Sequence, residues 1–207
     1  MDTPEKNGRR LTPENREQQI VSMAIEHFTR CGFSGSTREL AKQIGVTQPL
    51  LYRYFESKEA LIERVYNEVL QWRPVWERQI ADRSMPLAER LYAFYADYSS
   101  VILRKEWIRI FMFASLTRGG INNKHFSKLR NRIFLPVLAE MRAELGIEQP
   151  HDATREDVEL EMIWSLHSSI SHLAVRKWVY GLKASPYTEV GPSRQRGMES
   201  EAAEISR

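Results

Sequence analysis

The segment GVTQPLLYRYF, residues 45–55, combines a few apolar side chains with several that can form hydrogen bonds. Glutamine can form two hydrogen bonds to the edge of adenine, and arginine can bind guanine or a phosphate. An aliphatic side chain can contact a thymine methyl group, and a tyrosine hydroxyl can bind a phosphate. The candidates for these contacts are Gln48, Leu50, Tyr52 and Arg53. This set indicates contact with DNA if one helix presents it outward.

The apolar residues of the same segment predict how that helix is held. Leu51 and Phe55 are one turn apart, so in a helix they face the same way and anchor it to neighbouring helices. Thr47 is a favourable N-cap, and Pro49 is tolerated in the first turn. The other side chains then point away from the core. Packing alone is the alternative explanation of such a unit, but the expected exposure of Leu50 and Tyr52 together argues against it.

Two further helices must position this one. Ser36 and Glu39 form a capping-box pattern that starts a short helix, which Gly45 ends. A longer amphipathic helix is expected over residues 13–30, ended by Gly32. A long helix followed by two short ones with a glycine turn between them is a helix-turn-helix unit. The second short helix of such a unit lies in the major groove of DNA.

Five stretches in this region, in order, resemble the TetR family of bacterial transcriptional regulators. They are Gly32-Phe33, Thr37-Arg38-Glu39-Leu40-Ala41, Gly45-Val46-Thr47, Leu51-Tyr52-Arg53-Tyr54-Phe55 and Ser57-Lys58-Glu59-Ala60-Leu61. The resemblance covers roughly 50 residues, about a quarter of the chain, and is far more specific than a single short motif. Outside this region the sequences of the family vary widely, so the resemblance says less about the remainder of the chain.

The resemblance implies a set of DNA contacts at the two short helices and at the start of the next helix. The expected residues are Thr37, Arg38, Thr47, Gln48, Pro49, Leu50, Tyr52, Arg53, Tyr54 and Lys58. Lys58 is expected to bind a phosphate with help from the backbone amides of its helix. Tyr54 has core packing as an alternative. Arg9 and Arg10 have two readings, a minor-groove arm or a solvated terminus, and the second is favoured.

The remaining sequence predicts an all-α fold, because helical periodicity recurs and no strand alternation stands out. Helices are expected over residues 58–71, after Pro86, over 107–116 as a buried segment, over 122–145 and over 154–183. Residues 1–57 are expected to form the helix-turn-helix DNA-binding domain and 58–183 a larger helical body for effector binding and dimerisation. The polar segment 184–207 is expected to be a flexible tail.

The last two long helices are expected to pair with their copies in a homodimer. A single recognition helix buries little surface, so symmetric dimers that read two half-sites are usual. The resemblance implies that these helices form a four-helix bundle across the interface. The helix over 154–183 carries Val158, Met162, Leu166, Ile170 and Leu173 on one side and further apolar residues elsewhere. Coverage of both sides within one monomer is the alternative.

The resemblance also implies that the body holds a small effector of unknown identity between its helices. Aromatic walls with a few polar tips suit a mostly apolar ligand. The candidate residues are Phe94, Tyr95, Tyr98, Trp107, Phe111, Trp164 and His167. Plain core packing is the alternative for each of them. No metal site or other cofactor is expected, because His167 and His172 have a poor spacing for helical metal ligands.

The chain has 207 residues, a formal charge of +3 and a single cysteine, Cys31, which is expected to be a small buried side chain. We expect a cytoplasmic protein with no membrane segment, because no apolar stretch approaches a bilayer span and no signal peptide is evident. The expected function is a ligand-responsive transcriptional regulator, more often a repressor, that binds a palindromic operator as a dimer and is released by its effector. An effector-independent DNA-binding protein is the alternative. An enzyme is disfavoured, because no catalytic set of residues is present.

Overall fold

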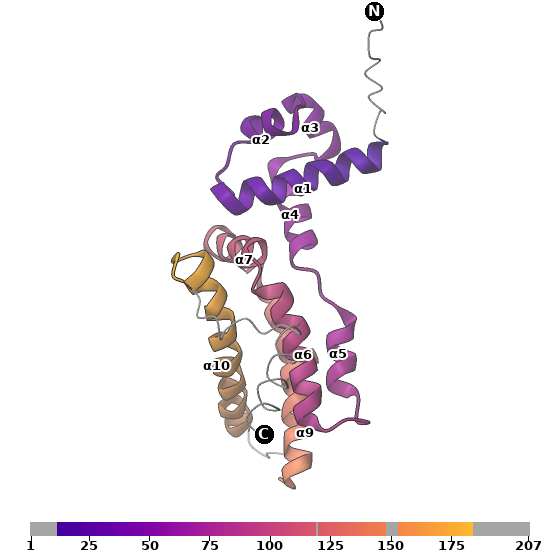
Figure 1. The fold of residues 1–207 in the computed structure, drawn as a ribbon, viewed down its shortest axis with the longest axis vertical. Coiled ribbons are helices and arrows are strands. Elements are labelled where there is room, and N and C mark those ends of the chain that lie inside the picture. Colours follow the sequence, from indigo (N-terminus) through magenta and orange to yellow (C-terminus); the bar gives the residue numbers. More distant parts are fainter. Residues whose placement is uncertain (1–11, 119, 148–152, 184–207) are drawn as a thin grey trace, which may run out of the picture. The chain divides into compact units, whose positions relative to one another are not determined.

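The computed structural model describes residues 12–118, 120–147 and 153–183. The regular elements in these three ranges are all helices, which confirms the predicted all-α class (Figure 1). The chain divides into two compact units, Met1–Leu70 and Gln71–Arg207. The tail predicted over 184–207 and the arginines at positions 9 and 10 lie outside the described residues.

The first unit contains four helices whose ends follow from local sequence. They are α1 (Pro13–Cys31), α2 (Thr37–Ile44), α3 (Gln48–Tyr54) and α4 (Lys58–Val69). Each begins after a Thr or Ser whose hydroxyl accepts a hydrogen bond from a backbone N–H of the first turn. α2 ends at Gly45, whose φ of 77° lies in the left-handed region that glycine adopts without steric cost. The predicted helix-turn-helix order is therefore present.

The core of the first unit draws on all four of its helices. Its buried side chains include Ile20, Ala24, Phe28, Leu40, Leu51, Phe55, Leu61 and Val65. α4 packs against α1 and buries an apolar stripe there. For this reason the compact unit extends to Leu70, whereas the sequence suggested a boundary after residue 57.

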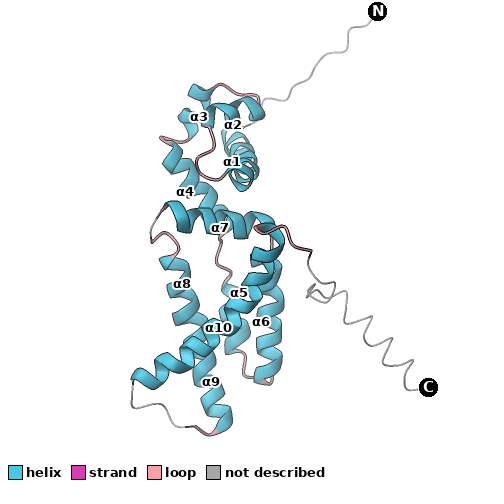
Figure 2. Ribbon diagram, turned by 90° about the vertical axis from the view of Figure 1, so that its left-hand side faces the viewer, coloured by secondary structure: helices cyan, strands magenta, loops and turns pink. Residues whose placement is uncertain are grey.

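The second unit is a bundle of six α-helices and one π-helical turn within the described residues. They are α5 (Pro74–Ala81), α6 (Leu87–Ile102), α7 (Lys105–Thr117), α8 (Asn123–Leu129), η1 (Arg130–Phe134), α9 (Leu135–Leu145) and α10 (Ala153–Trp178). α5 packs against α6, and α10 packs against α6, α7 and α9. In Figure 2, α10 crosses α9 at an angle.

The predicted helix over residues 122–145 is interrupted by the π-helical turn η1. The N–H of Leu135 donates to the carbonyl of Arg130, one residue further back than in an α-helix. Pro136 explains the disturbance, because it has no N–H to donate and its ring crowds the carbonyl four residues earlier. The helix ends at Gly146 with a φ of 64°, as predicted.

Two expectations about burial were wrong. α7 was expected to be wholly buried, but Leu116 is 78% exposed, while Trp107, Ile108 and Ile110 are buried. α7 packs on α6 and α10, and its Trp107 ring contacts His125 of α8, so the side of α7 that carries Leu116 stays open. Cys31 was expected to be buried and is exposed, because it is the last residue of α1, beyond the stripe that enters the core.

Candidate functional site

α3 separates an anchoring side from an outward side, as the sequence predicted. Leu51 and Phe55 are 1% and 6% exposed. Pro49, Tyr52 and Arg53 are exposed on the other side of the same short helix. Gln48, Leu50 and Tyr54 are half-buried, so the alternative of a packing role for Tyr54 stays open. This distribution leaves a mixed polar and cationic surface on α3.

Thr37 differs from the other predicted contact residues because it is buried, with an exposed fraction of 8%. Its Oγ1 accepts a hydrogen bond from Nε2 of Gln48 at 3.0 Å. The same oxygen lies 3.1 Å from the hydroxyl of Tyr52. The first residue of α2 therefore joins two side chains of α3 in one hydrogen-bonded group.

The three cations predicted to contact DNA come from α2, α3 and the start of α4. Arg38 in the first turn of α2 and Arg53 on α3 are exposed, and Lys58 begins α4. Among the described side chains, neither Arg38 nor Arg53 forms an ion pair with a carboxylate. Ser57 caps α4 by accepting from the N–H of Ala60 at 3.0 Å. Both arginines are therefore available to an anionic partner.

The structure brings the predicted effector residues of the second unit together in one aromatic cluster. Phe94 stacks on Tyr98 with ring centroids 5.2 Å apart, and Trp107 stacks on Phe111 at 4.8 Å. The ring of His167 contacts those of Tyr95, Tyr98 and Trp164. These rings therefore pack against one another.

His125 completes this cluster and was missed from sequence. Its ring contacts those of Trp107 and Phe111, and its Nε2 lies 3.2 Å from the hydroxyl of Tyr98. It therefore joins the α7 rings to the α6 rings. His125 is not among the candidate effector residues that the sequence suggested. The available signal was its position in the first turn of α8, which follows the largely apolar helix α7.

The two histidines of this cluster, His125 and His167, are neutral near pH 7. Burial lowers the pKa of His125 to about 4, and the neighbouring His167 and Lys128 lower it in the same direction. Burial also lowers the pKa of His167 to about 4. Nδ1 of His167 is buried and has no hydrogen-bond partner among the described residues. Such an atom costs free energy until something satisfies it.

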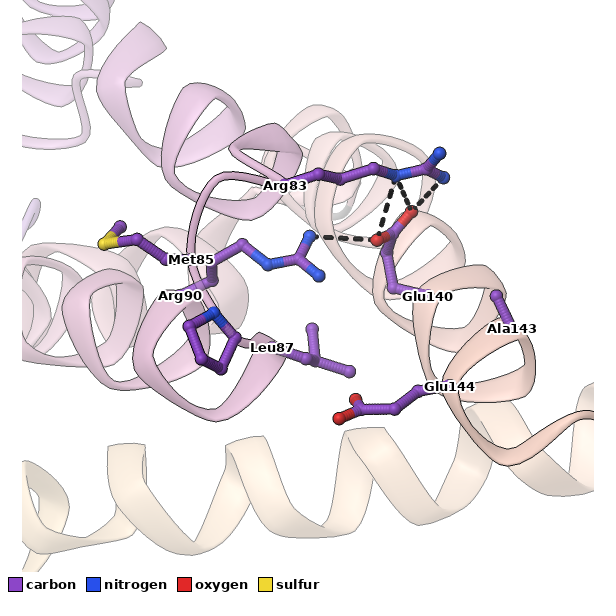
Figure 3. Close-up of a pocket in the computed structure, with 8 residues that line it drawn as sticks. Arg83, Met85, Leu87, Arg90, Glu140, Ala143 and Glu144 are labelled. Atoms are coloured by element: carbon purple, nitrogen blue, oxygen red, sulfur yellow. Dashed lines mark hydrogen bonds and ion pairs between the residues drawn. The ribbon is translucent and has the colours of Figure 1, made fainter.

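A separate pocket of about 340 Å³ lies where the turn between α5 and α6 meets α9 (Figure 3). Its lining residues are Arg83, Met85, Pro86, Leu87, Arg90, Glu140, Ala143 and Glu144. Thus no predicted effector residue lines this pocket. Glu140 receives hydrogen bonds from Arg83 and from Arg90, whose Nη1 is 2.9 Å away. The hydrogen bonds from the two arginines, Arg83 first, hold the pKa of Glu140 below its usual value.

The described residues show neither a metal-binding group nor a membrane span. No three of their His, Cys, Asp or Glu side chains gather as metal ligands would. Within the same ranges, no helix is long and apolar enough to cross a bilayer.

Comparison with known proteins gives a consistent result for the first unit. The family model described as "Bacterial regulatory proteins, tetR family" matches residues 20–65. The chain is 33% identical over 96 residues to the HTH-type transcriptional regulator RutR of Escherichia coli, a match that covers 46% of this chain and 39% of RutR. The residues matched by the family model include α2, α3 and the two loops that flank α3.

Longer matches extend over most of the chain at lower identity. The HTH-type transcriptional repressor KstR2 of Mycolicibacterium smegmatis is 23% identical over 181 residues, 84% of this chain and 82% of that protein. The crystal structure of a TetR-like transcriptional regulator from Rhodococcus sp. RHA1 has a TM-score of 0.62 at 20% identity, over 92% of this chain and 99% of that one. At such identity the structural likeness establishes the fold.

The helix-turn-helix geometry of α2 and α3 indicates a DNA-binding regulator. The family match over residues 20–65 and the relatives indicate the same class of protein. Residues 20–65 match the DNA-binding region of the TetR family, and the chain is similar over most of its length to transcriptional regulators of that type.

Proposed function

We propose that this chain is a dimeric, ligand-responsive repressor that binds a palindromic operator and leaves it when a small, mostly apolar effector binds. The observation that carries the proposal is the outward surface of α3, where Pro49, Tyr52 and Arg53 are exposed opposite buried Leu51. α3 acts as the recognition helix in the major groove. Repression is supported by the similarity to KstR2, whose name describes a transcriptional repressor.

The DNA-contacting roles divide by chemistry. Gln48 and Leu50 read base edges, since an amide can pair with adenine and an aliphatic group can meet a thymine methyl. Arg53 binds guanine or phosphate, and Arg38 and Lys58 bind phosphates. Thr47, Pro49, Tyr52 and Tyr54 line the same surface as supporting contacts. These assignments rest on residue type, exposure and place in the motif.

An exposed apolar stripe supports pairing through α9 and α10. Val158, Met162 and Leu166 follow one another at one-turn spacing on α10 and are 59%, 69% and 60% exposed. On α9, Leu145 is 67% exposed. Burying one such side chain contributes about 1.5–3 kcal/mol, so a self-complementary contact across a two-fold axis is favourable.

The aromatic cluster of the second unit supports an effector site. Its walls are apolar rings, and Nδ1 of His167 is a buried polar atom without a partner. A ligand with an apolar body and one hydrogen-bonding group would satisfy that nitrogen. The ligand acts as an effector only if it binds the DNA-released conformation more tightly than the DNA-bound one.

The close packing of these rings favours one alternative, a DNA-binding protein without an effector. Phe94, Tyr98, Phe134 and Trp164 already make stacked or edge contacts with their neighbours, so the cluster is consistent with plain core. A thermal-shift screen against metabolites and drugs separates the two functions. Stabilisation by a compound that also releases DNA supports the effector, whereas intact DNA binding with no stabilising compound supports the alternative.

The proposed function is tested by selecting DNA with the purified full-length protein. Fragments of genomic DNA that it retains at a fixed salt concentration are sequenced. We expect enrichment of a two-fold symmetric site whose half-sites are about one helical turn apart, bound by two chains. Retention without any shared sequence, or one chain per site, would contradict the proposal.

A further inference from the structure

The buried hydroxyl of Thr37 makes hydrogen-bonding contacts to two side chains that the proposed function places against DNA. Nε2 of Gln48 donates to it at 3.0 Å, and the hydroxyl of Tyr52 lies 3.1 Å from it. We propose that Thr37 is a positioning residue that fixes the amide of Gln48 for base recognition, and that it does not contact DNA through its own side chain. This inference rests on the proposed function, because it needs α3 in the major groove.

The hydrogen-bonding capacity of the Gln48 amide is consistent with this role. A glutamine amide carries two N–H donors and one carbonyl oxygen. Thr37 takes one N–H, which leaves the second N–H and Oε1. One donor and one acceptor are what the two-bond contact with the edge of adenine requires. The bond to Thr37 therefore leaves the base-reading capacity of Gln48 in place while it restricts the side chain.

The restriction matters because glutamine is flexible. An unattached glutamine has several rotatable bonds to immobilise when it meets a base, and ordering it beforehand improves both affinity and selectivity. Thr37 lies on α2, 11 residues before Gln48 and 15 before Tyr52, so the group also ties the first turn of α2 to α3. Donation by Thr37 to Tyr52 would leave the tyrosine proton free for a phosphate.

The burial of Thr37 argues against a direct contact. Only 8% of the residue is exposed, whereas neighbouring Arg38 is open to solvent. Its hydroxyl oxygen is already within hydrogen-bonding distance of two side-chain atoms. A phosphate would have to displace one of them to reach it. Base selectivity at the position read by Gln48 therefore depends on Thr37 indirectly.

The test compares Thr37→Val, which keeps the shape and removes the hydroxyl, with Thr37→Ser, which keeps the hydroxyl. Thr37→Ala is a second, smaller variant, and all proteins are compared at a temperature where melting curves show them folded. Affinity is measured for the selected operator and for variants with each base pair at every position, and again at several salt concentrations. Gln48→Ala identifies the position that Gln48 reads, and the Gln48→Ala/Thr37→Val double variant completes the cycle.

We expect T37V and T37A to lose about fivefold to tenfold of the base discrimination at the Gln48 position, because an ordered two-bond contact becomes a mobile one. T37S should retain the discrimination. The salt dependence of operator binding should not change. In the Q48A protein, T37V should cause no further loss of base discrimination. An equal loss of affinity for every sequence would overturn the inference, because it indicates a hydrogen bond from Thr37 to a phosphate, which carries no base information.

Two other results also decide the question. If T37V and T37A discriminate between bases as well as the wild type does, the role of Thr37 is wrong while the proposed function stands. If the wild-type protein itself shows no base preference at any position, the proposed function fails, and the role of Thr37 fails with it.

Discussion

The hydroxyl of Tyr98 and Nε2 of His125 lie 3.2 Å apart in the interior of the second unit. The contact joins α6 to α8 and is surrounded by the rings of Trp76, Trp107 and His167. Burial raises the pKa of Tyr98 and lowers that of His125. Both side chains are therefore neutral at pH 7. Because protonation of a buried histidine is unfavourable, lowering the pH destabilises the folded protein.

The stability of the protein should fall as the pH is lowered from about 6.5 towards 4. The pKa values of His125 and His167 are about 4 in the folded protein against an ordinary value of 6.5, so the unfolded chain binds more protons in this window. Each histidine lowers the free energy of unfolding by up to about 1.4 kcal/mol per pH unit there. Urea unfolding at pH 7, 6 and 5 measures the slope.

The control for this slope is His167→Phe, which removes one of the two titrating groups. The slope should be about half as steep in the variant. The carboxylates whose pKa values are lowered, such as Glu140 and Glu159, titrate below 4.5 and contribute little above pH 5. An unchanged slope in the variant, or equal stability at pH 7 and 5, would show that the histidines are not held neutral by burial.

His167→Phe should also weaken the response to the effector. The variant replaces a buried nitrogen that lacks a partner, so the free protein should melt no lower than the wild type. Once the screen has found an effector, its stabilisation of the variant should require about tenfold higher concentration, since one hydrogen bond is lost. His172→Phe, at an exposed histidine of the same helix, is the matched control. An unchanged effector titration in H167F would remove His167 from the site.

Glu140→Ala should destabilise the second unit. Arg90 is only 6% exposed, and its Nη1 bonds Glu140 at 2.9 Å, so the variant leaves a buried cation without its carboxylate. A loss of about 2 kcal/mol is expected in urea unfolding. Arg83→Ala removes the exposed partner of the same carboxylate and should have little effect. Equal losses in E140A and R83A would contradict this account of the ion pairs.

Met162→Glu should convert the proposed dimer into monomers. It places a charge in the middle of the exposed stripe formed with Val158 and Leu166, where pairing would bury it. Sedimentation at matched concentrations measures the state, and operator affinity should fall by more than tenfold because one recognition helix binds weakly. Glu161→Gln alters an exposed neighbour outside the stripe and should stay dimeric. A dimeric M162E protein would exclude the stripe from the interface.

Local features of the fold were predictable because short segments determine them. The pairing of Ser36 with Glu39 and the glycine at position 45 define α2 without reference to distant residues. The amphipathic spacing of Leu51 and Phe55 likewise identified the buried side of α3. The π-helical turn was missed, although Pro136 was a visible signal of a disturbed helix.

Contacts between distant residues were not predictable from spacing. Thr37 was expected to face DNA, and its burial depends on side chains 11 and 15 residues away. His125 belongs to the aromatic cluster because it contacts Tyr98, which lies 27 residues earlier in the chain. The pocket beside Arg83 depends on Glu140, 57 residues later. Such pairs arise from how the helices pack, which the pattern of one helix does not specify.

The central claim is that the outward surface of α3 binds DNA, and Arg53→Ala tests it most directly. Operator affinity is measured by gel-shift titration at one fixed salt concentration, beside Lys105→Ala, which removes an exposed positive charge from the second unit. Arg53 is exposed and forms no ion pair among the described residues, so melting should not change. We expect R53A to bind the operator at least tenfold more weakly while K105A binds as the wild type does. Equal operator affinity of R53A and wild type would contradict the assignment of α3 as the recognition helix.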